Sequence, residues 1–150
     1  MRIEILDSRP LLVVHASVVA KWFAPEIDDH LALRLRDRYH HHEVGLVGPG
    51  HLVPEVGNAL WKKARRGELT PHAAERCFEQ LLIDGPALID STEAMRSAFQ
   101  LALQHRHPLY DCLYLALAQE LRCDLITADE VFYGRMRPIY SFIRLLRDFA

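Results

Sequence analysis

The sequence predicts a single α/β domain: a three-layer α/β/α sandwich around a central, mostly parallel sheet. Short apolar runs alternate with longer helix-like segments along all 150 residues. No stretch resembles a linker, a repeat or a low-complexity region. Half of the residues are hydrophobic and a quarter are charged, as is ordinary for one globular domain of this length.

Four segments are expected to be strands. Residues 11–14, Leu-Leu-Val-Val, form a continuous apolar run that is typical of a buried parallel strand. Residues 124–127 give a second such segment, and residues 44–47 and 87–90 give weaker ones. Because helical segments separate these strands, we expect a parallel sheet with helices on both faces. Ligands of such sheets bind beyond the carboxyl ends of the strands.

Helices are expected between the strands, and several have recognisable ends. Ser17 can cap a helix over 18–23, and Gly67 is expected to end a helix over 52–66. Thr70 followed by Pro71 is typical of a helix start. Further helices are predicted from Asp28 and Asp29 to about 41, from 71 to 83, from a cap at Ser91 or Thr92 to 105, over 110–121 and over 141–149.

Composition narrows the classes of function. No apolar run approaches the roughly 18 residues of a membrane span, and no signal pattern begins the chain, so we expect a cytoplasmic protein that does not contact membranes. Three cysteines without a paired spacing are expected to be reduced. The formal charge of −2 leaves any nucleic-acid contact to local patches such as residues 62–66. Those cations could equally be the solvated end of a helix.

Three acids stand out from their surroundings. Glu55 and Asp111 each lie near the start of an otherwise apolar helical segment, and Asp129 follows the predicted strand that ends at Thr127. Acids near a helix start can simply cap it and complement its dipole. A carboxylate entering a buried helix, however, needs a partner, a cap or a metal ion.

Four blocks of sequence resemble the PIN-domain family, and in particular the VapC-type toxin ribonucleases. They follow one another at suitable spacing between about residues 11 and 134. Residues 1–10 form an N-terminal extension outside the resemblance, within one domain of 150 residues. The blocks are Val-Val-His-Ala-Ser from 13 to 17, Pro-Glu-Val-Gly-Asn-Ala-Leu from 54 to 60, Tyr-Asp onward from 110 to 118, and Leu-Ile-Thr-Ala-Asp-Glu from 125 to 130.

The resemblance implies an endoribonuclease that uses Mg²⁺ or Mn²⁺ to hydrolyse RNA phosphodiester bonds. Position by position, Glu55, Asp111 and Asp129 match the catalytic, metal-holding acids, and Ser17 and Thr127 match supporting hydroxyl positions. Members of the family commonly form homodimers and bind a cognate antitoxin across the active-site groove. An acidic cluster agrees with Mg²⁺, which is a hard cation that prefers oxygen ligands.

One position departs from the family pattern: His15 stands where the first metal-binding aspartate is expected. Three consequences are open. His15 can change the preferred metal, because imidazole suits Mn²⁺, Zn²⁺ or Ni²⁺ better than Mg²⁺. A protonated His15 can instead replace the metal as a cation beside Asp111 and Asp129. It can also only tune metal affinity while water fills the gap.

An alternative function follows from the second consequence: a degenerate PIN domain without nuclease activity that binds a partner protein or RNA. The other histidines, including residues 40–42, His105 and His107, are interpreted as solvated side chains at helix ends and turns. Trp22 and Trp61 could stack on bases, but such residues are more often core or interface anchors.

Overall fold

Five parallel strands form one sheet in the order β3-β2-β1-β4-β5. The computed structural model describes residues 8–149, so most of the predicted N-terminal extension, residues 1–7, lies outside the described part. The predicted parallel sheet is confirmed, and it gains a fifth strand. The strands are β1 (Leu11–Val14), β2 (Gly45–Pro49), β3 (Ala87–Ile89), β4 (Asp124–Thr127) and β5 (Ile143–Leu145).

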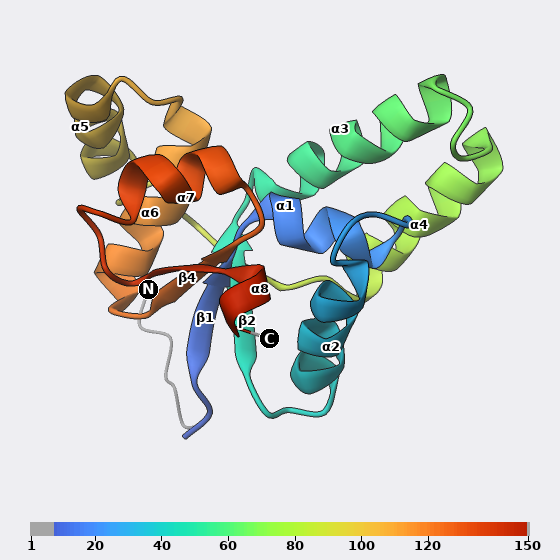
Figure 1. Cartoon of the computed structure of the whole chain (residues 1–150), viewed down its shortest axis with the longest axis horizontal. Coiled ribbons are helices and arrows are strands. Elements are labelled where there is room, and N and C mark those ends of the chain that lie inside the picture. The colour runs from blue at the N-terminus through green and yellow to red at the C-terminus, as the bar shows by residue number, and fades with distance from the viewer. Residues whose placement is uncertain (1–7, 150) are drawn as a thin grey trace.

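Helices cover both faces of the sheet, which confirms the three-layer architecture. Figure 1 shows α5, α6 and α7 on one side of the strands and α1 to α4 on the other. The helices are α1 (Ala16–Val19), the 3-10 turn η1 (Ala20–Trp22), α2 (Asp29–His40), α3 (Leu52–Arg65), α4 (Pro71–Asp84), α5 (Met95–His105), α6 (Leu109–Leu121), α7 (Glu130–Met136) and α8 (Leu146–Phe149).

Helix α6 is the most deeply buried helix of the core. Every residue from 112 to 118 is buried, and the helix packs against β1, β2 and β4 with α5 behind it. A helix that is apolar all round must be buried in this way. Its first turn nevertheless carries one acid, Asp111. The Asp111 carboxylate therefore lies at the edge of the hydrophobic core.

The end of the chain differs from the prediction. The helix expected over 141–149 is wrong, because residues 143–145 form β5 beside β4 and only 146–149 are helical. Ile143 and Leu145 are buried while Arg144 between them is exposed, which is the alternation of a strand with one covered face. Helix α7 was not predicted at all. Segments this short carry too few residues for periodicity to separate strand from helix.

Two predicted helix starts also need correction. His15, not Ser17, is the N-cap residue of α1, and Ser17 lies inside that helix. Helix α5 begins at Met95 without a side-chain cap, because the hydroxyl and backbone N–H of Thr92 both donate to Asp90 in the preceding turn. Both hydroxyl residues therefore serve contacts that are not helix caps.

Other predicted helix ends are confirmed. The Thr70 hydroxyl accepts a hydrogen bond from the Ala73 N–H at 3.1 Å, with Pro71 in the first turn of α4. Gly67 follows α3 with a φ of +76°, a left-handed conformation that glycine adopts without steric cost. These ends fix the length of α3, which matters because α3 carries Glu55.

The strand order reverses between β1 and β4. From β1 the chain adds β2 and β3 on one side, and later β4 and β5 on the other. A parallel α/β sheet binds its ligands beyond the carboxyl ends of the strands at such a switch point. His15 directly follows β1, Thr127 ends β4, and the His15 N–H donates to the Ile126 carbonyl at 2.9 Å. The topology thus places these two predicted site residues side by side.

Two expectations from composition can be compared with the structure. Among residues 8–149, no helix combines the length and apolar character needed to cross a bilayer. All three cysteines are free thiols, as predicted. Burial raises the pKa of Cys112 and of Cys123 to about 11, which keeps both thiols protonated and unreactive at neutral pH.

The fifth strand gives a test of the fold. Ile143→Ala should lower the free energy of unfolding by about 2–5 kcal/mol, because the Ile143 side chain is fully buried. Ile139→Ala is the matched control: Ile139 is 57% exposed and its loss should cost less than about 0.5 kcal/mol. Urea unfolding followed by circular dichroism measures both. Equal, small effects would contradict the assignment of Ile143 to a covered strand.

Candidate functional site

His15 lies buried at the end of β1 with both ring nitrogens hydrogen-bonded. Its Nε2 is 2.9 Å from Oδ1 of Asp111. Its Nδ1 is 2.7 Å from the Ser17 hydroxyl and 3.2 Å from the Thr127 hydroxyl. The ring also stacks on Phe132 and meets the ring of Tyr114 edge-on. At the position that departs from the family pattern, each ring nitrogen therefore has a hydrogen-bond partner and the ring contacts two aromatic side chains.

The Ser17 and Thr127 hydroxyls bind the backbone after β4 as well as His15. Ser17 accepts a hydrogen bond from the Ala128 N–H at 3.0 Å, and Thr127 accepts one from the Asp129 N–H at 3.1 Å. Each hydroxyl keeps its own hydrogen and a further lone pair. The pair can therefore either donate to Nδ1 of His15 or accept from it. Without a metal ion, Nε2 faces a carboxylate oxygen that only accepts when ionised, so the ring proton lies on Nε2 and Nδ1 accepts from a hydroxyl.

Asp111 is held between two histidines. His15 contacts Oδ1, and Nε2 of His107 contacts Oδ2 at 2.7 Å. Burial raises the pKa of the Asp111 carboxyl, but the hydrogen bonds of His15 and His107 and the electrostatic attraction to their rings outweigh burial and hold the pKa below the ordinary 3.8. The Asp111 side chain is 19% exposed. It is therefore an ionised carboxylate at neutral pH, in the first turn of a largely buried helix.

His107 was expected to be solvated, and the structure places it elsewhere. It is buried, and its Nδ1 lies 3.0 Å from Nη1 of Arg135. A guanidinium can only donate, so Nδ1 accepts and the ring proton sits on Nε2, where it is donated to Asp111. Arg135 itself is anchored on the backbone carbonyls of His105 and Arg106. Sequence analysis did not place this residue in the site; its position four residues before Asp111 was the available signal.

Glu55 has a comparable pair of partners. Its Oε1 accepts a hydrogen bond from the Tyr114 hydroxyl at 3.2 Å and lies 2.9 Å from Nε2 of His51. His51 precedes α3 by one residue, four positions before Glu55. Burial and the negative charge of Glu55 raise the pKa of Tyr114 far above its ordinary value, so the phenol remains a donor. His51 is a second histidine of the site that sequence analysis did not single out.

Three predicted site residues converge. His15, Glu55 and Asp111 each offer one ligand atom, and these atoms lie within 4.8 Å of one another. One imidazole nitrogen and two carboxylate oxygens, one of them on a carboxylate held ionised, form a donor set that suits a divalent cation. An imidazole nitrogen is a softer donor than a carboxylate oxygen. The residues present therefore fit a metal ion.

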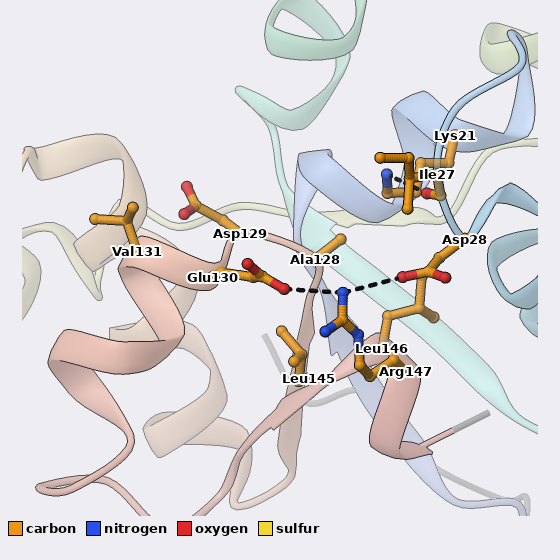
Figure 2. A pocket seen from close by; sticks show the side chains of 10 residues that line it. All are labelled: Lys21, Ile27, Asp28, Ala128, Asp129, Glu130, Val131, Leu145, Leu146 and Arg147. Carbon is orange, nitrogen blue, oxygen red and sulfur yellow. Dashed lines mark hydrogen bonds and ion pairs between the residues drawn. The ribbon is translucent and has the colours of Figure 1, made fainter.

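Asp129 lies apart from this group of three. Its Oδ1 accepts a hydrogen bond from the Phe132 N–H at 3.0 Å and so caps α7. Its Oδ2 has no hydrogen-bond partner among residues 8–149. Figure 2 shows the Asp129 carboxylate pointing away from Arg147, whereas the neighbouring Glu130 points toward Arg147. The predicted acid thus has a structural role and one oxygen to spare.

A hollow of about 350 Å³ adjoins Asp129. Arg147 crosses it and pairs with Glu130 at 2.8 Å and with Asp28 at 3.4 Å (Figure 2). Exposed apolar side chains, Ile27 and Val131, also line it. The carboxyl edge of the sheet therefore offers room beside the site for part of a ligand.

Comparisons with known proteins give one consistent result. The family model described as the PIN domain matches residues 12–135. Ribonuclease VapC3 of Pyrobaculum aerophilum is 37% identical over 121 residues, which cover 79% of this chain and 88% of that protein. The crystal structure of PAE2754 from Pyrobaculum aerophilum superposes with a TM-score of 0.69 at 21% identity, covering 93% of each chain. That of Mycobacterium tuberculosis VapC20, a toxin that cleaves the sarcin–ricin loop, gives 0.62 at 13% identity over 83% of this chain and 95% of that one.

The interaction between His107 and Asp111 can be tested with a matched pair of variants. His107→Met removes the donor and should weaken Mn²⁺ binding by roughly 10- to 100-fold, because groups that orient metal ligands contribute about that much. His107→Gln can still donate to Asp111 and accept from Arg135, so it should restore most of the affinity. Isothermal titration calorimetry measures both, and thermal unfolding checks that each variant folds. Equal affinity in the wild type and the Met variant would contradict this role.

Proposed function

Because the chain belongs to the PIN-domain family, we propose that it is a divalent-metal-dependent endoribonuclease of the VapC type that hydrolyses RNA phosphodiester bonds. The observation that carries this proposal is the convergence of His15, Glu55 and Asp111 at the switch point of the sheet. The resemblance to Ribonuclease VapC3 supports the same chemistry. The sequence-based predictions of family and fold are confirmed.

In this proposal Glu55, Asp111 and His15 hold the metal ion. When bound, a divalent cation supplies an acidified water for hydrolysis and positive charge for the phosphate. Asp111 stays ionised between its two histidines, and Tyr114 and His51 orient Glu55. These hydrogen bonds would keep both carboxylates in position before RNA arrives, so that little reorganisation is needed during reaction.

Asp129, Ser17 and Thr127 complete the proposed site. Asp129 retains one free oxygen at the same edge of the sheet, which suits a contact through water to the metal or to the RNA. Ser17 and Thr127 hold the backbone after β4 against β1 and support Nδ1 of His15. With a proton on Nδ1 shared with these hydroxyls, the Nε2 lone pair of His15 becomes available to a cation.

The identity of the metal ion is a separate part of the proposal. Mg²⁺ or Mn²⁺ is expected for the family, and the nitrogen donor of His15 favours Mn²⁺ in this chain. We further propose action on RNA in the cytoplasm, as a homodimer neutralised by a cognate antitoxin. These partners rest on the family resemblance to VapC-type toxins.

One observation favours a second candidate, a PIN domain that binds RNA or protein without cleaving. The His15 Nε2 already lies 2.9 Å from Asp111, so the imidazole can satisfy this carboxylate without any metal. In that case the imidazole ring would take the place of the metal ion as the partner of Asp111, and the domain would be stable and catalytically inactive. The two candidates differ in one measurable property, which is metal binding.

His15→Asp separates the candidates. We expect the wild type to cleave RNA faster with Mn²⁺ than with Mg²⁺, and His15→Asp to gain activity with Mg²⁺, because it restores a hard oxygen ligand. A fluorogenic RNA cleavage assay with each ion measures this, and Asp111→Asn is the inactive control.

Calorimetry with Mn²⁺ gives a second, independent result. Binding by the wild type supports the nuclease. No binding by the wild type together with Mg²⁺-dependent cleavage by His15→Asp supports the inactive binding domain. Cleavage by the wild type that is equally fast with Mg²⁺ would contradict the preference assigned to His15.

A further inference from the structure

Helix α3 connects the site to a cluster of cations. Glu55 lies in its first turn, and Lys62 and Arg66 follow seven and eleven positions later, at the end of the helix. At 3.6 residues per turn these spacings correspond to nearly whole turns, so Glu55, Lys62 and Arg66 share one face. At a rise of 1.5 Å per residue, the two cations lie roughly 10 and 16 Å along the axis from Glu55.

These cations are available for a ligand. Lys63 on the neighbouring face is paired with Glu26 at 3.0 Å and with Glu68 at 3.6 Å. Within the part of the chain that the structure describes, Lys62, Arg65 and Arg66 have no acidic partner within ion-pair distance, and all three are exposed. Glu68, which follows the cluster in the chain, is thus already engaged by Lys63.

An exposed aromatic ring lies among the cations. Trp61 is 54% exposed, although tryptophan is a residue that proteins usually cover. The Arg65 guanidinium lies 4.7 Å from the centre of its ring. An exposed indole beside arginine offers bases a stacking surface and phosphates a charge at the same place. Of the two common roles expected for Trp61, core anchor or interface anchor, its exposure excludes the core.

The helix dipole alone does not explain this arrangement. Cations are favoured in the last turn of any helix, and that accounts for some of the positive charge. It requires neither an exposed tryptophan nor the alignment of Lys62 and Arg66 with Glu55. The formal charge of the chain is −2, so attraction of a polyanion to the whole molecule is not available. A local row of cations on the helix that carries Glu55 would supply this attraction.

We propose that the outer face of α3, formed by Trp61, Lys62, Arg65 and Arg66, binds the single-stranded part of the RNA substrate that extends from the site. Lys62 and Arg66 contact phosphates, and Trp61 with Arg65 stacks on an unpaired base. Single-stranded RNA fits this surface because its unstacked bases can reach an aromatic ring, which bases in a duplex cannot. The inference rests on the proposed ribonuclease function and assigns a surface that binds the substrate of that enzyme.

RNA binding without cleavage tests the surface directly. The probe is a short, unstructured, fluorescein-labelled oligoribonucleotide, and anisotropy is recorded in EDTA so that no divalent ion is present. The test variant is Lys62→Glu/Arg66→Glu. The matched control is Arg34→Glu/Arg96→Glu, which changes the net charge equally at exposed arginines of α2 and α5. Thermal unfolding verifies that both variants fold.

The expected results are specific to α3. The test variant should bind roughly tenfold more weakly, and the slope of log K against log salt should become shallower by about 0.7 for each phosphate that the protein no longer neutralises. The control should keep the salt dependence of the wild type. Trp61→Ala should weaken binding at least about fivefold, and Trp61→Phe should restore part of it, because stacking tolerates any aromatic ring.

Two outcomes overturn the inference: equal weakening in the test and control variants, or no RNA binding by the wild type in EDTA. Failure of the proposed function has a different signature. In that case the wild type cleaves no RNA with Mn²⁺ or Mg²⁺, while its binding still depends on Lys62, Arg66 and Trp61.

Discussion

The carboxylate of Asp111 is the constraint on which the rest of the site depends. It enters the core on a helix whose following residues, 112–118, are all buried. A charge in this position is unfavourable unless it is paired and hydrogen-bonded. His15, directly after β1, and His107, in the loop before α6, each contact one oxygen. These two histidines hold Asp111 ionised and fix where its oxygens point, and every role proposed for the site follows from that geometry.

The same arrangement explains how a histidine can stand at the first acidic position without disrupting the fold. The ring finds hydroxyl partners on one nitrogen, a carboxylate on the other, and aromatic side chains on its faces. Histidine in place of a carboxylate removes one negative charge, and with it the repulsion that this carboxylate would have added to the site in the absence of a cation. It also adds a softer donor, which changes the ions that the site suits best.

Sequence patterns predicted the elements that carry the most apolar residues. Strands β1 and β4 have the predicted bounds because continuous apolar runs must be covered on both faces. The elements that were missed, α7 and β5, lie after residue 128 and are too short for periodicity to identify. The strand conformation of residues 143–145 depends on a tertiary contact, because β5 pairs with backbone groups of β4 that would otherwise be unpaired.

The sequence by itself determined the family and the parallel sheet, because these follow from local runs and motif spacing, and it singled out Glu55 and Asp111, which the structure brings together with His15. Only the tertiary structure decided what those residues touch. His15 and Asp111 are 96 positions apart and meet through the pairing of β1 with β4 and the packing of α6. Arg135 reaches His107 across 28 positions in the same way, whereas the contacts of His107 with Asp111 and of His51 with Glu55 span only four positions. Hydrogen bonds between distant segments depend on distances that the fold creates, and no local pattern records them. In the sequence, His15 is a departure from the family pattern. In the structure, it is the hydrogen-bond partner of one oxygen of Asp111.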